Sequence, residues 1–264
     1  MNENIKWGAA AAAVVGLSIG AVVYFSGRKH VEPPPAEPVV AATPPRVAAP
    51  EEPAIKHPMP AAQQQEALPA LNESDETIQG AVKGLVGEKP FEQIFIPDDL
   101  IRHIVVSIDN LPEQKVAEKI RAVKPVPGRF AVQGSEDAPV LDPANYERYK
   151  PMVQLLTSID TKQLIATYTR YYPLFQEAYE SLGHPPDYFN DRLVVVIDHL
   201  LETPDVHDPV RLVQPSVQYK FADPQLESLS AGQKALIRMG SANAAQVKVK
   251  LRELRTALLA QPRT

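Results

Sequence analysis

The sequence contains no cysteine, and this absence removes several kinds of chemistry at once. Without a thiol the chain has no disulfide, no cysteine ligand for zinc, no thiolate nucleophile and no acylated cysteine of the lipoprotein type. The H-E-x-x-H zinc motif and the calcium-binding loop of an EF-hand are also missing. We therefore predict no bound metal and no cofactor. A lack of cysteine is compatible with an oxidising envelope compartment but does not establish one.

An excess of basic residues is lacking too. The 27 Lys and Arg residues oppose 32 Asp and Glu residues, which gives a formal net charge of −5. Nucleic-acid-binding proteins usually have a basic balance, so we predict no nucleic-acid partner. The basic residues are concentrated near the end of the chain, where 232–264 contains seven Lys and Arg against Glu253 alone. Lys248, Arg252 and Arg255 are spaced for one helical face and are predicted to bind an anionic partner; the alternative is the acidic remainder of this chain.

Small apolar residues are abundant near the start of the chain. Residues 8–25 form an unbroken run, GAAAAAVVGLSIGAVVYF, between Trp7 and Arg28-Lys29. As a helix this run is about 27 Å long, close to the ~30 Å hydrocarbon core of a bilayer. It is longer than the apolar part of a normal signal peptide, and no clear cleavage site follows it. We predict that residues 1–7 are an N-terminal tail and that residues 8–25 are a transmembrane helix in the lipid bilayer.

Small residues recur every four positions within this run, at Gly8, Ala12, Gly16 and Gly20. Such a face lets two membrane helices approach closely, and it predicts a homodimer; the alternative is that Gly and Ala are simply common in membrane helices. Residues 16–20 also match the nucleophile motif G-x-S-x-G. That motif requires a turn between a strand and a helix, so inside a membrane helix it has no catalytic meaning.

Proline is strongly over-represented, and eleven of the 27 prolines lie between Val31 and Pro69. Proline fixes φ and removes a backbone donor, which favours extended chain over helix or sheet. We predict that residues 26–69 are a Pro/Ala-rich linker that acts as a semi-stiff tether. The alternative is a ligand for proline-recognition domains.

The orientation of the predicted membrane helix has two interpretations. Lys6, offset by Glu3, flanks one side, and Arg28 and Lys29 flank the other. The positive-inside rule therefore slightly favours a cytoplasmic carboxyl side. A long Pro/Ala spacer is instead typical of a periplasmic domain. We predict a single-pass protein of the bacterial inner membrane with its globular domain in the periplasm.

Residues 70–264 have the pattern of a globular domain, and we predict a mainly α, multi-helix fold with a small β ribbon. A further helix is expected over residues 98–109, and Pro173 is expected to bend or restart a later one. The extended runs 129–133 and 217–221 are expected to pair as the ribbon. The remaining helix starts are marked by capping side chains or by proline in the first turn: Ser74, Asp142-Pro143, Asp160, Asp187, Asp223-Pro224 and Ser241.

Several short segments resemble a known family. They are NYERY at 145–149, YPLFQEAY at 172–179, FNDR at 189–192, IDHLL at 197–201, and residues 221–240. Together they resemble a bacterial membrane-anchored domain family of unknown function, number 3014 in that series, over nearly all of residues 71–260. The resemblance implies an anchored domain in Gram-negative envelopes. It implies no reaction and no ligand, so it transfers no role to any residue.

The densest group of titratable residues lies in 184–208. Helical spacing places Asp191, Asp198 and Glu202 on one face, and His199 stands three positions before Glu202. Asp191, Asp198 and His199 are therefore the alternative prediction for an acid–base or metal site. The other interpretation is a solvated acidic helix face followed by a polar loop.

Two further sets of side chains have structural and functional interpretations. Arg148 and Arg192 are predicted to be buried partners of Asp191 or Asp198, fixing helix crossings by bidentate pairing. The tyrosines favour a core stripe over an interface, and they are Tyr146, Tyr149, Tyr168, Tyr171, Tyr172 and Tyr179.

Two functional hypotheses of different classes follow. In the first, the chain is a tethered scaffold or adaptor whose helical domain binds an unknown protein partner. In the second, it is an envelope enzyme or ligand sensor that uses the Asp/His cluster at 184–208. Under the scaffold hypothesis, no residue of the chain has a catalytic role.

Overall fold

The structure is a computed structural model of the chain. It describes residues 54–60, 67–114, 121–184 and 187–261. The chain divides into two units, Met1–Ala49 and Pro50–Thr264, and only the second contains described residues. The predicted membrane helix, its small-residue face and most of the predicted linker lie outside the described residues. Within the described ranges no helix is long and apolar enough to cross a membrane.

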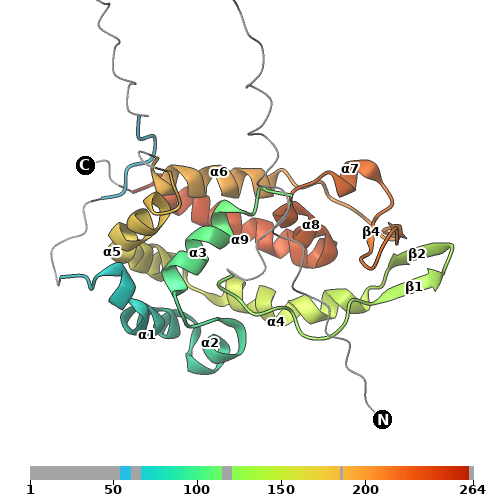
Figure 1. Ribbon diagram of the computed structural model, residues 1–264, viewed down its shortest axis with the longest axis horizontal. Helices are drawn as coiled ribbons and strands as arrows, with labels where there is room; N and C mark the ends of the chain where they lie inside the picture. Colours follow the sequence, from blue (N-terminus) through green and yellow to red (C-terminus); the bar gives the residue numbers. More distant parts are fainter. Residues whose placement is uncertain (1–53, 61–66, 115–120, 185–186, 262–264) are drawn as a thin grey trace, which may run out of the picture. The chain divides into compact units, whose positions relative to one another are not determined.

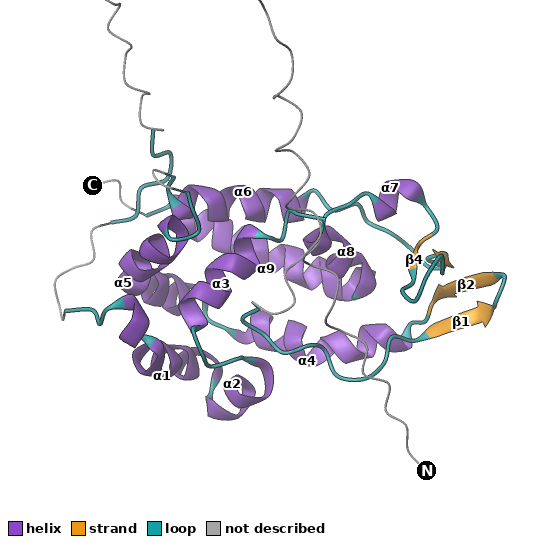
Figure 2. Cartoon of the chain, in the orientation of Figure 1, coloured by secondary structure: helices purple, strands orange, loops and turns teal. Residues whose placement is uncertain are grey.

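Helices make up most of the second unit, as Figures 1 and 2 show. After a short 3-10 turn, η1 (Leu71–Glu73), the described helices are α1 (Asp75–Val86), α2 (Glu88–Ile94), α3 (Leu100–Asp109), α4 (Ala144–Ser158), α5 (Thr161–Glu180), α6 (Phe189–Leu201), α7 (Pro224–Glu227), α8 (Ala231–Arg238) and α9 (Ser241–Leu259). The strands are β1 (Val132–Ser135), β2 (Ala138–Leu141), β3 (Leu212–Val213) and β4 (Lys220–Phe221). The predicted mainly helical fold with minor β content is confirmed.

Helix α9 connects most of the helical body. It packs against α4, α5, α6 and α8, and Figure 1 shows it crossing the middle of the body. Helix α3 in turn packs against α1, α5 and α6. The largest core cluster includes the fully buried Leu100 and Phe189 together with Tyr171, Tyr172 and Tyr179. For these three tyrosines the core interpretation is confirmed.

Aspartate side chains make several of the predicted helix starts. The carboxylates of Asp142, Asp160 and Asp223 each accept a hydrogen bond of 2.8 Å from a backbone N–H two or three positions later. A short carboxylate reaches the free amides of a first helical turn in this way. Helices α5 and α7 begin directly after Asp160 and Asp223. The local sequence therefore determines where these helices begin.

Helix α1 begins directly after Ser74 as predicted, but neither Ser74 nor Ser241 forms a side-chain cap. Ser74 Oγ donates instead to the carbonyl of Leu71, at 2.8 Å. Helix α9 begins at Ser241 itself, after Gly240 in the N-cap position with φ of 85°. A Cβ at residue 240 would lie 2.6 Å from Cγ of Tyr146. Glycine is needed there because both the positive φ and the close packing exclude a side chain.

Pro173 does not restart a helix. Helix α5 continues through it from Thr161 to Glu180. Helix α5 ends three residues before Gly183, which has φ of 95°. Helix α6 begins at Phe189, two residues after the predicted start at Asp187.

The predicted pairing of residues 129–133 with 217–221 is wrong. Strand β1 pairs antiparallel with β2, and β3 pairs antiparallel with β4, which gives two ribbons joined by a bridge between Val140 and Arg211. Only the two turn residues Glu136 and Asp137 separate β1 from β2. A contact this local loses less loop-closure entropy than one across the domain. The two predicted runs still meet through Phe130 and Tyr219, whose ring centroids are 6.0 Å apart.

Candidate functional site

Asp191 holds a segment from the predicted linker against the helical domain. We call residues 54–60 the strap. The carboxylate of Asp191 accepts hydrogen bonds from the backbone N–H groups of Lys56, at 2.9 Å, and His57, at 2.7 Å. Met59 of the strap is buried in the largest core cluster. The end of the linker is therefore part of the packed domain.

Two residues beside Asp191 complete the docking of the strap. The Asn190 side chain donates to the carbonyl of His57 at 2.8 Å, and the Tyr188 hydroxyl accepts from the N–H of Met59 at 2.8 Å. Tyr168 donates to the buried Asn190 at 3.3 Å. Burial raises the pKa of Tyr168 well above its usual value of 10, so this hydroxyl keeps its proton and its donor role.

The other two residues of the alternative site have different partners. Asp198 forms a bidentate pair with Arg255 of α9, in which Nη2 is 3.1 Å from Oδ2 and Nε contacts Oδ1. Hydrogen bonding to Asp198 and the negative charge of Asp198 raise the pKa of Arg255. His199 Nε2 lies 2.9 Å from Ser230 Oγ. The backbone carbonyl of His199 accepts a hydrogen bond of 3.1 Å from the Gln233 side chain. Because Ser230 and Gln233 form the capping box of α8, His199 connects α6 to the start of that helix.

Asp191, Asp198 and His199 thus share α6, but each contacts a different element: the strap, α9 and α8. Over the described parts of the chain, no group of three or more His, Asp or Glu side chains could hold a metal ion. The structure gives each of the three residues a structural partner. Their proposed catalytic role stays a prediction.

The two arginines expected to pair with Asp191 or Asp198 do not do so. Arg192 Nε binds the Asp109 carboxylate at 2.7 Å, and its Nη2 binds the Asp109 carbonyl at 2.8 Å. Asp109 ends α3, where the free carbonyls and the helix dipole favour a cation. Arg148 binds backbone carbonyls, including that of Pro127 at 2.8 Å. The spacing along α6 therefore identified the acidic residues but not their partners.

The basic side chains of α9 are mostly directed into the domain. Lys248 is buried and binds the carbonyl of Thr203 at 2.6 Å and Asp205 at 2.7 Å. With Arg255 on Asp198, two of the three predicted anion-binding residues contact carboxylates of this chain, and Arg252 is exposed. The prediction of an external anionic partner remains untested.

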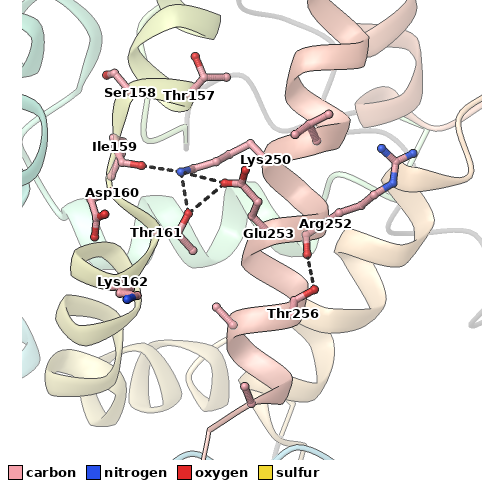
Figure 3. Close-up of a pocket in the computed structure, with 13 residues that line it drawn as sticks. Thr157, Ser158, Ile159, Asp160, Thr161, Lys162, Lys250, Arg252, Glu253 and Thr256 are labelled. Atoms are coloured by element: carbon pink, nitrogen blue, oxygen red, sulfur yellow. Dashed lines mark hydrogen bonds and ion pairs between the residues drawn. The ribbon is translucent and has the colours of Figure 1, made fainter.

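A fourth basic residue of α9, Lys250, was not singled out from the sequence. It is buried, and its ammonium contacts the carbonyl of Ile159, the hydroxyl of Thr161 at 2.8 Å and Glu253 at 3.6 Å (Figure 3). These contacts fix the junction between α4 and α5 to α9. The sequence offers no signal that separates this buried lysine from an exposed one.

Lys250 is one of the residues that line an open hollow of about 900 Å³ between the α4–α5 junction and α9, which we call the groove. Its lining includes three basic side chains, Lys162, Lys250 and Arg252, and two acidic ones, Asp160 and Glu253. In Figure 3 Lys250 and Glu253 point toward one another, and the Arg252 guanidinium is directed away from them.

An apolar cavity of about 270 Å³ lies among α1, α3, α5, α6 and α9. Its walls are aliphatic and aromatic, with Val82 and Leu85 from α1, Ile104 from α3 and Leu254 from α9. These side chains are only partly buried although they are apolar. Nothing in the amino-acid sequence indicates that these helices leave space between them.

Residues 100–255 match the family described as Protein of unknown function (DUF3014). The chain belongs to this family. No curated protein and no solved structure matched the chain.

The DUF3014 match confirms the resemblance seen in the short segments, over a shorter range than the expected 71–260. It begins with α3 and ends within α9. Elements before the match still build the same core, since Leu71, Ile78 and Phe91 belong to one buried cluster with Leu100. The DUF3014 description names no reaction and no ligand, so the roles of individual residues are argued from their contacts alone.

Proposed function

We propose that the chain is a single-pass protein of the bacterial inner membrane that presents its helical domain in the periplasm as a scaffold or adaptor for another protein. The observation that carries the proposal is a set of exposed apolar side chains on and beside the two ribbons. We call Phe130, Val213 and Val217 the ribbon patch; they are 40%, 44% and 92% exposed. The rings of Phe130 and Tyr219, whose centroids are 6.0 Å apart, bring the two ribbons together beside these side chains, and exposed apolar surface is typical of protein-binding sites.

The polar side chains support a binding role over a catalytic one. The carboxylates of Asp191 and Asp198 and the imidazole of His199 are each held in a contact between elements. An acid–base site needs titratable groups directed together at a shared space. The ribbon patch, in contrast, has apolar surface left over for a partner.

The proposed location depends on the N-terminal sequence. The apolar run 8–25 has the length of a bilayer-spanning helix, and the proline-rich residues after it suit a tether. Because the strap is docked on α6, such a tether would end at the domain surface near residue 54. Reporter fusions to the C-terminus, one active only in the periplasm and one only in the cytoplasm, test this location. Activity of the cytoplasmic reporter alone would contradict the periplasmic assignment.

The scaffold function is tested by isolating the full-length chain from membranes and identifying a stoichiometric partner. Phe130→Asp and Val217→Asp place a charge in the ribbon patch and should abolish the association. Val195→Asp is the matched control, because Val195 is 54% exposed but lies on α6. Equal loss of the partner in all three variants, or in none, would reject the ribbon patch as the binding surface.

A further inference from the structure

The apolar cavity has the properties of a small-molecule site. Its volume of about 270 Å³ is close to the lower end, roughly 300 Å³, of typical ligand pockets. Among the described residues of its lining, only Thr167, Tyr168 and Tyr171 carry hydroxyls. The Tyr168 hydroxyl is already bonded to Asn190. The space therefore offers an occupant apolar contact and almost no hydrogen bonding.

Water is a poor occupant of such a space. A buried water needs two to four polar partners, and apolar cavities of about 150 Å³ stay dry and bind benzene. Apolar side chains facing an unfilled space also lose the dispersion contacts that a close-packed interior provides. An apolar guest restores these contacts.

The cavity adjoins the polar groove, which suggests what kind of apolar guest it takes. Ile159 lines both spaces, and the α9 residues Glu253 and Leu254 are neighbours that line one space each. Lys162 and Arg252 are exposed in the groove. A molecule with an apolar chain and a polar, negatively charged end matches these two adjacent surfaces.

We propose that the cavity binds one hydrocarbon chain of an amphiphile, whose polar end lies in the groove beside Ile159. The shared chemistry of the occupant is an acyl chain, supplied either as a free fatty acid or as part of a membrane lipid. This site is separate from the ribbon patch, so binding there does not depend on the scaffold function.

The test uses the full-length chain in phosphatidylcholine vesicles. In one arm the vesicles contain a fatty acid with a photoreactive diazirine in its chain, and in the other a phosphatidylglycerol with the same group. After illumination, labelled positions are mapped by peptide mass spectrometry. We expect labels on the segments 78–86 and 164–175, which line the cavity from α1 and α5. Labelling by the free acid alone identifies a fatty-acid site, and labelling by the phospholipid identifies a lipid site.

Variants separate the cavity from the surface. Ala81 lines the cavity, and Ala81→Phe should lower labelling of both segments by about tenfold because the benzyl group takes up part of the space that the hydrocarbon chain would occupy. Ala166→Phe is the matched control on α5, since Ala166 is exposed and does not line the cavity; it should keep the labelling. If circular dichroism shows that Ala81→Phe is unfolded, Ala81→Leu replaces it. Absence of label from both segments in both arms, or label that persists in the filled variant, overturns the proposal.

Discussion

At the scale of single residues, the charged side chains of α6 and α9 act mainly as connections between elements. Asp198 joins α6 to α9, Lys248 joins α9 to Asp205, and Asp191 joins α6 to the strap. Helical spacing predicted which of these residues share a face. It could not predict their partners, because each partner lies at least 43 positions away in the sequence.

Asp191→Ala should release the strap. The substitution removes the acceptor of two backbone N–H groups, one exposed and one part-buried, and a typical hydrogen bond contributes about 0.5–1.5 kcal/mol. We expect faster hydrogen–deuterium exchange in residues 54–60 and a lower free energy of unfolding. Glu202→Ala removes an exposed carboxylate at the end of the same helix and is the control. Unchanged exchange in the strap would contradict the role assigned to Asp191.

The pair of Lys248 and Asp205 predicts a pH dependence of stability. The hydrogen bond and charge of Lys248 hold the pKa of Asp205 below its usual value of 3.8. A carboxyl whose folded-state pKa is depressed stabilises fully above its unfolded pKa, and that stabilisation is lost as the pH falls through the folded-state pKa. Asp205→Asn should therefore be less stable than wild type at about pH 5–7, and the difference should shrink below pH 3.8. Urea titrations at several pH values measure this, and a difference that does not change with pH would refute it.

At the scale of elements, the sequence predicted where segments begin more accurately than how they pair. The carboxylates of Asp160 and Asp223 cap α5 and α7 as expected, because capping is decided within one helical turn. Ribbon pairing was wrong because two short extended runs do not specify their partners. The start of α9 differs for a tertiary reason, since Tyr146 packs against the position where only Gly240 fits.

Helix α9 fixes the α4–α5 junction through Lys250, and this predicts the effect of a single substitution. Lys250→Met keeps the apolar stem but removes the ammonium. The Ile159 carbonyl and the Thr161 hydroxyl then lose their hydrogen-bond donor. We expect a loss of about 1–3 kcal/mol in the free energy of unfolding. Arg252→Met on the exposed face should change it by less than about 0.5 kcal/mol. Equal effects in chemical denaturation would contradict this account.

At the scale of the whole molecule, the folded unit extends beyond the segment that defines the family. The family match begins at residue 100, yet Leu71, Ile78 and Phe91 are buried in one cluster with Leu100 and Phe189. The strap adds Met59 to that cluster. The cavity also takes one of its walls from α1. The sequence predicted a domain starting near residue 70, but the docking of the strap depends on contacts across more than 120 positions and leaves no local pattern.

Two truncated chains test this extent of the folded unit. A chain of residues 50–264 keeps the strap and every described helix, so it should unfold cooperatively at the same temperature as the full-length chain. A chain of residues 100–264 retains the family match but loses Met59, Leu71, Ile78 and Phe91 from the core. Burial of each such side chain contributes about 1.5–3 kcal/mol, and domains of this size are stable by only about 5–15 kcal/mol. Circular dichroism should therefore show a broad, non-cooperative transition or none, whereas a sharp transition at the full-length temperature would show that the core is complete without the first helices.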